Sequence, residues 1–351
     1  MPRGTRQRRR MINSVAPIRI CDNGGWTDTW FAEYGCIFNI GVYPYAEVQV
    51  EVFDRNTVDD RIVINAENYG ERFAIATTEG PWTHHPLLEA AIDYMRLPDN
   101  IAFEVTIYCD APAGCSTGTS AAVTVALIGA LDLLTPGRMT PYDVALTAQR
   151  IETQKLGQQC GIQDQLCSAY GGINYIEMFA YPHAAVSQIQ VSNSVWWELE
   201  RRLVLIFLGK AHSSSAVHEK VIAELEGGSP DNPKLEALRR TAGISRDAVY
   251  AGDFPTLGRA MSDNTDAQAR LHPELVGTDA QQIIDIASEH GALGWKVNGA
   301  GGDGGSLSLL AGDVSHERRE MVRAIEAANP GFRALPIYLS RHGLRLWESI
   351  C

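Results

Sequence analysis

Small and hydroxyl-bearing residues begin the segment Ala111–Leu134, which then continues as an unbroken apolar helix pattern. Pro112, Gly114 and Gly118 leave backbone N–H groups accessible in the first part of this segment. A helix that begins near Thr119 adds the positive end of its dipole to these N–H groups. The segment therefore predicts a loop that can bind an anion such as a phosphate.

The hydroxyl groups of this loop admit two interpretations. Ser120, in the first turn of the helix, could reach a magnesium ion that is bound to a phosphate. Ser116, Thr117 and Thr119 could instead serve only as helix caps, and the loop taken by itself favours this simpler role slightly. The segment lacks the lysine of the pattern G-x-x-x-x-G-K-[ST], so the ordinary P-loop fold is not supported.

A second glycine cluster, Lys296–Gly305, contains the pattern G-x-G-x-x-G at Gly299, Gly301 and Gly304. The pattern is a weak signal here, because the strand-like segment Ser306–Leu310 follows it where a dinucleotide-binding fold would have a helix. A Rossmann dehydrogenase is therefore disfavoured. We expect instead a turn that lets the backbone approach a ligand or another segment closely.

Charged residues surround a Gly-Gly turn in the segment Ala16–Gly35. Arg19 and Asp22 precede the turn, and Asp28 follows it. Charges near a turn are usually only solvated. Trp26, however, would offer an apolar face to a sugar ring while a carboxylate binds the sugar hydroxyl groups.

Two more carboxylates belong to the segment Gln149–Leu166. Glu152 lies late in one helix pattern, and Asp164 lies at the beginning of the next. Taken singly, each is explained as a surface charge or a helix cap. Only the order and joint content of the four segments raises these residues above such separate explanations.

Together the four segments resemble the GHMP kinases, the superfamily of galactokinase and of homoserine, mevalonate and phosphomevalonate kinases. The resemblance extends from about Ala16 to Leu310 and is carried by "APIRICDNGGWTD", "PAGCSTGTSA" and "KVNGAGGDGG". It implies a two-lobed GHMP kinase fold, with an α/β N-terminal lobe of ribosomal-protein-S5-like type and a ferredoxin-like α+β C-terminal lobe. ATP would lie between the lobes, with Mg²⁺ as its partner.

The resemblance also implies roles for individual residues. Ser120 and Glu152 would hold the magnesium ion, and Asp164 matches the catalytic aspartate of the sugar kinases in the family. Asp164 would either take the proton of the attacking hydroxyl group or orient that group, and the sequence leaves both roles open. Arg19 would keep this carboxylate ionised, and Asp28 would bind sugar hydroxyl groups.

Wider sets of residues follow from the same resemblance. The ATP phosphates would lie on Pro112, Gly114, Cys115, Ser116, Thr117, Gly118, Thr119 and Ser120. The sugar would be held by Arg19, Gly24, Gly25, Trp26, Thr27, Asp28 and Asp164. A substrate that carries a phosphate needs a local cationic site in this acidic chain, and Lys210, His212 and the serines at 213–215 are candidates by their position. The glycine loop, with Lys296, Gly299, Gly301 and Gly302, would shape the site from the second lobe.

The chain departs from the family pattern in three places. Ser116 and Thr117 replace the usual Gly-Leu of the phosphate loop, and Asp303 interrupts the final glycine run. Gly25 replaces a glutamate of the galactokinases, which argues against galactose as the substrate.

Within the superfamily, the Gly-Gly-x-Thr-Asp turn and Leu208–Val221 are most similar to the sugar 1-kinases, above all the D-glycero-D-manno-heptose 7-phosphate kinases. Those enzymes act in the synthesis of bacterial surface polysaccharide, that is, of capsule and lipopolysaccharide.

Other functions stay open at this point. A fucokinase, a glucuronokinase, a mevalonate kinase or a homoserine kinase would share the fold, and Trp26 and Asp28 favour a polyol among these substrates. A catalytically silent sensor of a sugar or nucleotide belongs to a different class. The joint presence of Asp164, Glu152 and Ser120 disfavours the sensor, because binding alone needs no base.

Periodicity predicts a strand-rich first third and a lobe boundary near Asn193. Strands are expected at Ala46–Phe53, Arg61–Ala66, Ile101–Asp110, Gly171–Met178, Ala185–Val191, Arg202–Leu208 and Ser306–Leu310. Helices are expected at Ala121–Leu134, Tyr142–Leu156, Gln163–Ala169, Ser215–Glu226, Pro233–Ala251, Phe254–Leu271, Asp279–Gly291 and His316–Ala328. We expect a disordered leader at 1–11, a first lobe at 12–193 and a second lobe at 194–351.

Composition limits the partners. With 30 basic and 42 acidic side chains, the net charge of −12 argues against general binding to nucleic acid or to an anionic membrane. The apolar run Ala121–Leu134 is shorter than a membrane span, and no signal-peptide core follows the basic start. We therefore expect a cytoplasmic protein with reduced cysteines that binds ATP and a sugar phosphate, and a homodimer is left open.

Overall fold

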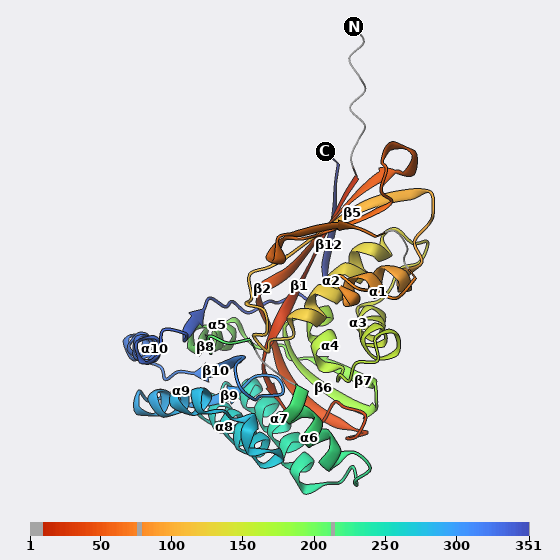
Figure 1. The fold of residues 1–351 in the computed structure, drawn as a ribbon. Coiled ribbons are helices and arrows are strands. Elements are labelled where there is room, and N and C mark those ends of the chain that lie inside the picture. The colour runs from red at the N-terminus through yellow and green to blue at the C-terminus, as the bar shows by residue number, and fades with distance from the viewer. Residues whose placement is uncertain (1–9, 76–78, 212–214, 351) are drawn as a thin grey trace.

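The computed structural model describes residues 10–75, 79–211 and 215–350, which fold into two lobes (Figure 1). The first lobe contains the larger sheet and the second lobe a smaller one. No helix within these ranges is both long and apolar enough to cross a bilayer. The predicted division into an α/β lobe and an α+β lobe is confirmed.

An eight-stranded sheet forms the first lobe. Its strands are β1 (Arg10–Asn23), β2 (Gly35–Asp54), β3 (Ile62–Ala66), β4 (Glu71–Ala74), β5 (Ile101–Cys109), β6 (Ile173–Ala180), β7 (His183–Gln188) and β12 (Arg345–Ile350). They lie in the order β12-β1-β2-β5-β3-β4, with β6 and β7 continuing from β2. β2 is 20 residues long, pairs with β6 at one end and β5 at the other, and has β1 along its opposite edge. Its length lets one strand link both halves of the sheet.

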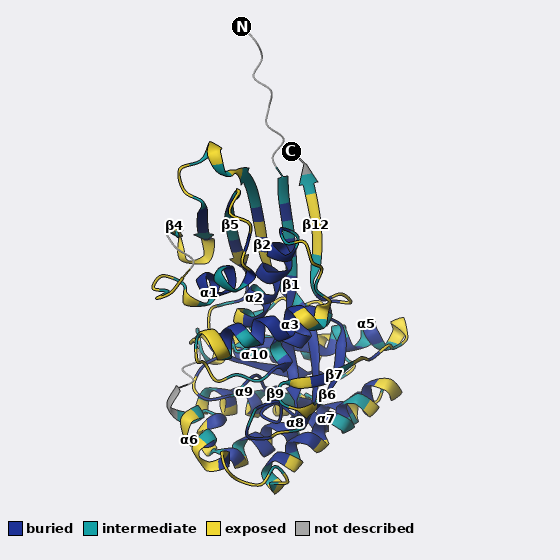
Figure 2. Cartoon of the chain, turned by 90° about the vertical axis from the view of Figure 1, so that its right-hand side faces the viewer, coloured by how far each residue is buried: buried dark blue, intermediate teal, exposed yellow. Residues whose placement is uncertain are grey.

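Four helices cover one face of this sheet (Figure 1): α1 (Pro86–Met95), α2 (Thr119–Asp132), α3 (Pro141–Arg150) and α4 (Gln163–Tyr170). α2 contacts β1, β2 and the other three helices, and nearly all of it is buried (Figure 2). This central position explains why its sequence is apolar on every side. α3 begins at Pro141, one residue before the expected range, where Thr140 and Asp143 form a reciprocal capping box.

A four-stranded antiparallel sheet forms the second lobe, in the order β11-β8-β10-β9. Its strands are β8 (Leu203–Phe207), β9 (Gly294–Val297), β10 (Ser306–Leu310) and β11 (Arg333–Leu335). Its helices are α5 (Asn193–Arg202), α6 (Ser215–Leu225), α7 (Pro233–Ala251), α8 (Phe254–Leu271), α9 (Thr278–Glu289) and α10 (Ser315–Ala328). Short 3-10 turns occur at Arg55–Thr57, Glu67–Tyr69 and Pro273–Leu275, and a π-helical turn at Ile151–Lys155 follows α3.

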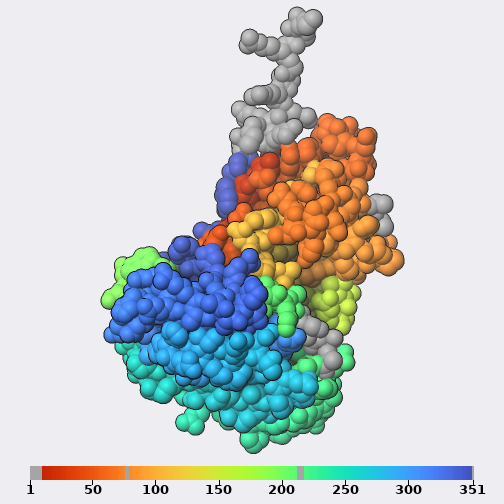
Figure 3. All heavy atoms as spheres, turned by 60° about the vertical axis from the view of Figure 1, so that its left-hand side comes forward, coloured from red at the N-terminus to blue at the C-terminus, as the bar shows by residue number. Residues whose placement is uncertain are grey.

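The two lobes share an apolar core. Ile18 and Ile20 of β1 pack in one buried cluster with Trp196 of α5 and with Leu257 and Met261 of α8. α7 and α8 both contact β1 directly, and the lobes form one continuous body (Figure 3). Side chains on β1 are therefore held in a fixed position relative to the second lobe.

The chain ends in the first lobe, which differs from the predicted second lobe of 194–351. β12 pairs with β1 along Arg10–Val15, and the last segment lies beside the first strand (Figure 3). β1 also begins inside the predicted leader of 1–11, because Arg10 pairs with Ile350 and its guanidinium binds Glu348 at 2.8 Å. These contacts join opposite ends of the chain, so local periodicity could not predict them. The predicted boundary near Asn193 coincides with the start of α5.

Candidate active site

The predicted phosphate loop connects β5 to α2 and leaves the start of that helix open. Gly118 is the N-cap of α2, and no side chain of the described residues caps its first turn. The hydroxyl groups of Ser116, Thr117 and Thr119 therefore do not cap this helix, which was the simpler interpretation. Gly114, Ser116 and Gly118 adopt positive φ angles of 69°, 57° and 69°. This backbone, followed by an uncapped helix N-terminus, is suited to an anion.

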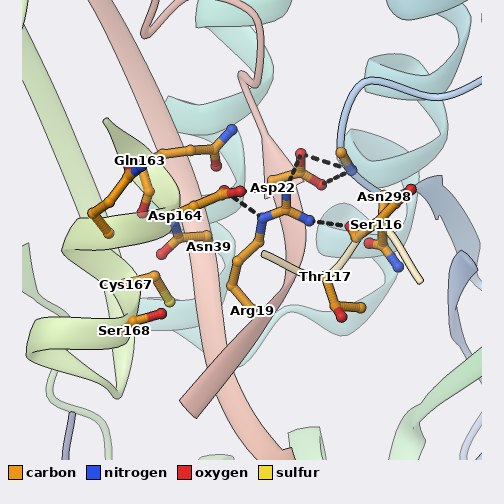
Figure 4. Close-up of polar contacts among 12 residues, drawn as sticks. Arg19, Asp22, Asn39, Ser116, Thr117, Gln163, Asp164, Cys167, Ser168 and Asn298 are labelled. Atoms are coloured by element: carbon orange, nitrogen blue, oxygen red, sulfur yellow. Dashed lines mark hydrogen bonds and ion pairs between the residues drawn. The ribbon is translucent and has the colours of Figure 1, made fainter. Parts of the chain in front are cut away.

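Arg19 and Asp164 form a bidentate ion pair at the centre of the site (Figure 4). Nε of Arg19 lies 2.7 Å from Oδ1 of Asp164, and Nη2 lies 3.2 Å from Oδ2. Arg19 is almost fully buried in β1, whereas 28% of the Asp164 side chain is exposed. Arg19 also binds the phosphate loop, since its backbone N–H donates to Thr117 O at 2.9 Å and its guanidinium donates to Ser116 O. One arginine thus links the predicted catalytic carboxylate to the loop.

Glu152 lies beside Asp164 on the π-helical turn after α3. Its carboxylate is buried and accepts a hydrogen bond from Nε2 of Gln165 at 2.7 Å. Burial, with a smaller contribution from the charge of Asp164, raises the pKa of Glu152 to about 7. Such a carboxylate is costly to keep ionised without a cation, so a positive ion close to it would be stabilising.

A cavity of about 210 Å³ joins these groups. Its polar lining includes Arg19, Asp28, Ser120, Glu152, Gln163, Asp164 and Gln165, and its apolar wall includes Trp26, Trp30, Phe31 and Ile222. His218 of α6 and the loop residues Gly299 and Ala300 close it from the second lobe. Three of the lining residues have a buried polar atom without a hydrogen-bond partner among the described residues: Trp26 (Nε1), Gln163 (Oε1) and Gln165 (Oε1). These side chains have hydrogen-bonding capacity that a polar ligand could use.

Asp28 takes part in this cavity and also supports α4. Its Oδ2 accepts hydrogen bonds from the backbone N–H groups of Ile162 and Gln163. Gly161 packs directly on it, since a Cβ atom there would lie 1.9 Å from that oxygen. Burial raises the pKa of Asp28 to about 6. The predicted binding of sugar hydroxyl groups stays a prediction, while the support of α4 is a role that sequence reasoning missed.

The glycine loop of the second lobe reaches β1. The backbone N–H of Gly299 donates to both oxygens of Asp22, at 3.1 and 3.0 Å. A Cβ atom on Gly299 would lie 3.1 Å from Ser116 O, so glycine allows the two loops to touch. Lys296 precedes this loop in β9 and binds Asp22 at 3.2 Å. Gly301 and Gly302 lie further out, where Gly302 N–H binds Leu275 O.

Some of the predicted substrate residues lie elsewhere. Lys210 is 58% exposed and pairs with Asp279 at 2.9 Å and Asp303 at 3.6 Å, outside the residues that line the cavity. His212 lies outside the described residues. Gly24 and Thr27 stabilise the turn. Gly24 N–H donates to Oδ1 of Asn264 in the second lobe, and the Thr27 hydroxyl donates to Gly24 O.

Several cavity residues were not predicted. Gln163 and Gln165 flank Asp164 in the sequence, and this adjacency is a signal that could have found them. Trp30 and Phe31 similarly follow the predicted sugar-binding turn. His218 belongs to the segment Leu208–Val221, whose similarity to the sugar 1-kinases was noted, but its place beside the cavity depends on the packing of the two lobes.

Family models match both lobes. The model of the GHMP kinases N terminal domain matches residues 86–172, and that of the GHMP kinases C terminal domain matches residues 245–328. The chain therefore belongs to the GHMP kinase superfamily. The predicted phosphate loop and Asp164 both lie within the first matched region.

Three relatives illustrate the range of this family. The chain is 27% identical to the D-glycero-alpha-D-manno-heptose 7-phosphate kinase of Campylobacter jejuni over 60% of this chain and 62% of that protein, which is less than two thirds of its length. It is 28% identical to the mevalonate kinase of Thermococcus sibiricus over 74% and 76% of the two chains. It is 26% identical to the bifunctional fucokinase/GDP-fucose pyrophosphorylase of Arabidopsis thaliana over 89% of this chain and 31% of that protein.

Solved structures share the fold over nearly the whole chain. The crystal structure of a D-glycero-D-manno-heptose 1-phosphate kinase from Bacteroides thetaiotaomicron superposes with a TM-score of 0.74 and 23% identity, covering 96% of this chain and 98% of that one. The galactokinase of Lactococcus lactis complexed with galactose gives a TM-score of 0.73 and 16% identity, covering 95% of each chain. At these identities the likeness establishes the fold.

Proposed function

We propose that the protein is an ATP-dependent sugar kinase that phosphorylates the anomeric hydroxyl group of D-glycero-D-manno-heptose 7-phosphate. The product would be the 1,7-bisphosphate, made in the cytoplasm for nucleotide-activated heptose and bacterial surface polysaccharide. The observation that carries the proposal is the position of Asp164, paired with Arg19 in a cavity that also contains Ser120 and Glu152. The similarity to the Campylobacter jejuni heptose kinase supports the choice of sugar.

The ATP phosphates would lie at the open N-terminus of α2, over the backbone of Gly114 to Ser120. Arg19 holds the Ser116 and Thr117 carbonyl oxygens, which fixes the loop before the nucleotide arrives. Phosphoryl transfer depends chiefly on positioning and on neutralising charge, and a preorganised loop provides the first of these.

The residues around Glu152 fit a magnesium ion. The carboxylate is buried, has a raised pKa and faces the same cavity as the Ser120 hydroxyl group. Carboxylate and hydroxyl oxygens are ligands that Mg²⁺ prefers. Ser120 and Glu152 would therefore hold the ion, which would neutralise charge on the ATP phosphates when bound.

Asp164 would accept the proton of the attacking hydroxyl group or orient that group toward the γ-phosphate. Its side chain is partly exposed to the cavity, so a substrate can reach it. Arg19 binds both carboxylate oxygens and thereby fixes their orientation. The ion pair therefore positions the carboxylate for either role.

The rest of the cavity suits a polyol. Trp26, Trp30 and Phe31 offer apolar surface to the ring of a sugar, while Asp28 and Gln163 offer polar atoms to its hydroxyl groups. Fucose 1-phosphorylation is the second candidate. It is supported by the Arabidopsis thaliana fucokinase, to which the similarity extends over 89% of this chain.

A coupled assay of ADP release tests the proposal. ATP and Mg²⁺ are supplied with heptose 7-phosphate, heptose, mannose, fucose, glucuronic acid, galactose or mevalonate. We expect turnover of heptose 7-phosphate, and Asp164→Asn should reduce kcat by about 1,000-fold, as loss of a general base does. The matched control is Asp247→Asn, because Asp247 is exposed on α7 and pairs only with Arg246 among the described residues.

The outcomes separate the candidates. Turnover of fucose but not of heptose 7-phosphate would replace the proposed substrate with the second candidate. Turnover of heptose without its phosphate would show that the 7-phosphate is not required. ATP binding with no turnover of any compound would favour the sensor.

A further inference from the structure

A buried ion pair joins the second lobe to β1 next to the Arg19–Asp164 pair. Nζ of Lys296 lies 3.2 Å from Oδ1 of Asp22, and the two side chains are 1% and 0% exposed. Nζ also donates to Oε1 of Gln268 at 3.1 Å and to Val297 O. Burial lowers the pKa of Lys296, so keeping an ammonium group here is costly. The free-energy cost of burying this charged lysine suggests that the ion pair has a function in the site.

The arrangement of Asp22 and Arg19 indicates that role. Nη2 of Arg19 lies 3.2 Å from Oδ2 of Asp164, and Oδ2 of Asp22 lies 4.0 Å from the same nitrogen (Figure 4). Two carboxylates therefore lie close to the same guanidinium nitrogen. If Asp22 had no other partner, its buried negative charge would attract Arg19 away from Asp164.

Asp22 does have other partners, and they come from the second lobe. Lys296 binds Oδ1, and the backbone N–H of Gly299 donates to both oxygens. These contacts compensate the charge of Asp22. The guanidinium of Arg19 therefore pairs with Asp164, with 2.7 Å between Nε and Oδ1. The four charges alternate in sign along Lys296, Asp22, Arg19 and Asp164.

We propose that Lys296 is a positioning residue for phosphoryl transfer, which neutralises Asp22 so that Arg19 stays bound to Asp164. The inference rests on the proposed kinase function. According to this inference, β9 and the glycine loop contribute to the site by placing Lys296 and Gly299 against Asp22 of β1 when the second lobe packs on that strand. Lys296 touches neither reacting group and acts through Asp22 and Arg19.

Two variants test the charge argument. Lys296→Met keeps most of the length of the side chain and removes the charge that compensates Asp22, so we expect kcat to fall by about 100-fold, as small misplacements of catalytic groups do. The double variant D22N/K296M removes the competing carboxylate as well, and we expect its kcat to return to within about threefold of the wild type. Lys234→Met is the matched control, since Lys234 is a partly exposed lysine of the same lobe, paired with Glu224.

Steady-state kinetics and thermal unfolding are measured for each variant. Recovery of kcat in the double variant supports the inference, because a lysine that merely filled space would not be rescued by a change of Asp22. Folded K296M with the wild-type kcat overturns it, and so does a double variant as slow as K296M. Wild-type turnover is measured first, so failure of the proposed function, seen as no turnover by any form of the protein, is distinct from both.

Discussion

The carboxylate of Asp28 lies at the beginning of α4, where its Oδ2 accepts hydrogen bonds from the backbone N–H groups of Ile162 at 2.9 Å and Gln163 at 3.0 Å. Asp164 follows in the first turn of the same helix. A carboxylate at this position satisfies N–H groups that have no partner within the helix and interacts favourably with the helix dipole. Asp28 therefore holds the element that carries the proposed base.

The buried position of Asp28 makes stability depend on pH. Its pKa of about 6 lies above the unfolded value of 3.8, so the folded protein binds a proton that the unfolded chain has lost. The stability from this proton is fully present below pH 3.8 and is lost as the pH rises through about 6, an effect of about 3 kcal/mol. Urea unfolding of the wild type and of Asp28→Asn from about pH 4 to about pH 7 measures it. The difference in unfolding free energy between the two should shrink with rising pH, and a constant difference would contradict the argument.

Gly161 should not tolerate a side chain. A Cβ atom there would lie 1.9 Å from Oδ2 of Asp28 and would displace the carboxylate from α4. We expect Gly161→Ala to destabilise the protein by about 2 kcal/mol and to lower kcat as well, because Asp164 shifts with its helix. Gly137→Ala is the control, since that position has nothing within 4 Å of an added Cβ. Equal unfolding midpoints for the two variants would show that α4 adjusts without cost.

Glu152 should control the requirement for Mg²⁺. Glu152→Gln keeps the shape of the side chain but removes the charge that would attract the ion, so we expect the Mg²⁺ concentration for half-maximal activity to rise by at least about tenfold. Calorimetric titration of ATP with and without Mg²⁺ provides a second readout, in which the benefit of Mg²⁺ should be lost. Glu236→Gln removes an exposed carboxylate of α7 as the control. An unchanged Mg²⁺ dependence in E152Q would remove Glu152 from the proposed ion site.

Local signals predicted most of the regular elements. α7 and α8 occur at the residues where they were expected, and the structure shows a proline in the first turn of each and an acceptor side chain at each N-cap, Asn232 and Asp253. The phosphate loop and Asp164 were also marked by local composition and by the family pattern, and their roles stay predictions. Where the signal lies within one segment, the sequence is informative.

Contacts between distant segments were not predicted, for a physical reason. The pairing of β12 with β1 and the capping of α4 by Asp28 depend on which segments meet after folding, and no local pattern encodes the partner. Lys210 shows the converse problem. Its charge and its position in the sequence made it a candidate phosphate ligand, but Asp279 and Asp303 from elsewhere in the chain already pair with it.

The indole nitrogen of Trp26 should contribute to binding of the sugar. Trp26 lines the cavity, is 8% exposed and stands edge-on to His218, with 5.1 Å between ring centroids. Its buried Nε1 has no hydrogen-bond partner within the described part of the chain, so a sugar hydroxyl group would satisfy it. Trp26→Phe keeps an aromatic ring but removes this donor together with part of the ring surface. We expect the KM for the sugar to rise by about fivefold, the effect of one net hydrogen bond, with the KM for ATP unchanged.

Trp197→Phe is the control for this substitution, because Trp197 is 57% exposed on α5. A rise in the KM for ATP with no change for the sugar would mean that the nitrogen faces the nucleotide. The apolar wall would then belong to the ATP side of the cavity, and the sugar would lie closer to Asp28 and Gln163. The two KM values thus decide which substrate the aromatic wall serves, because Trp26→Phe changes this wall and leaves the ion pair of Arg19 and Asp164 intact.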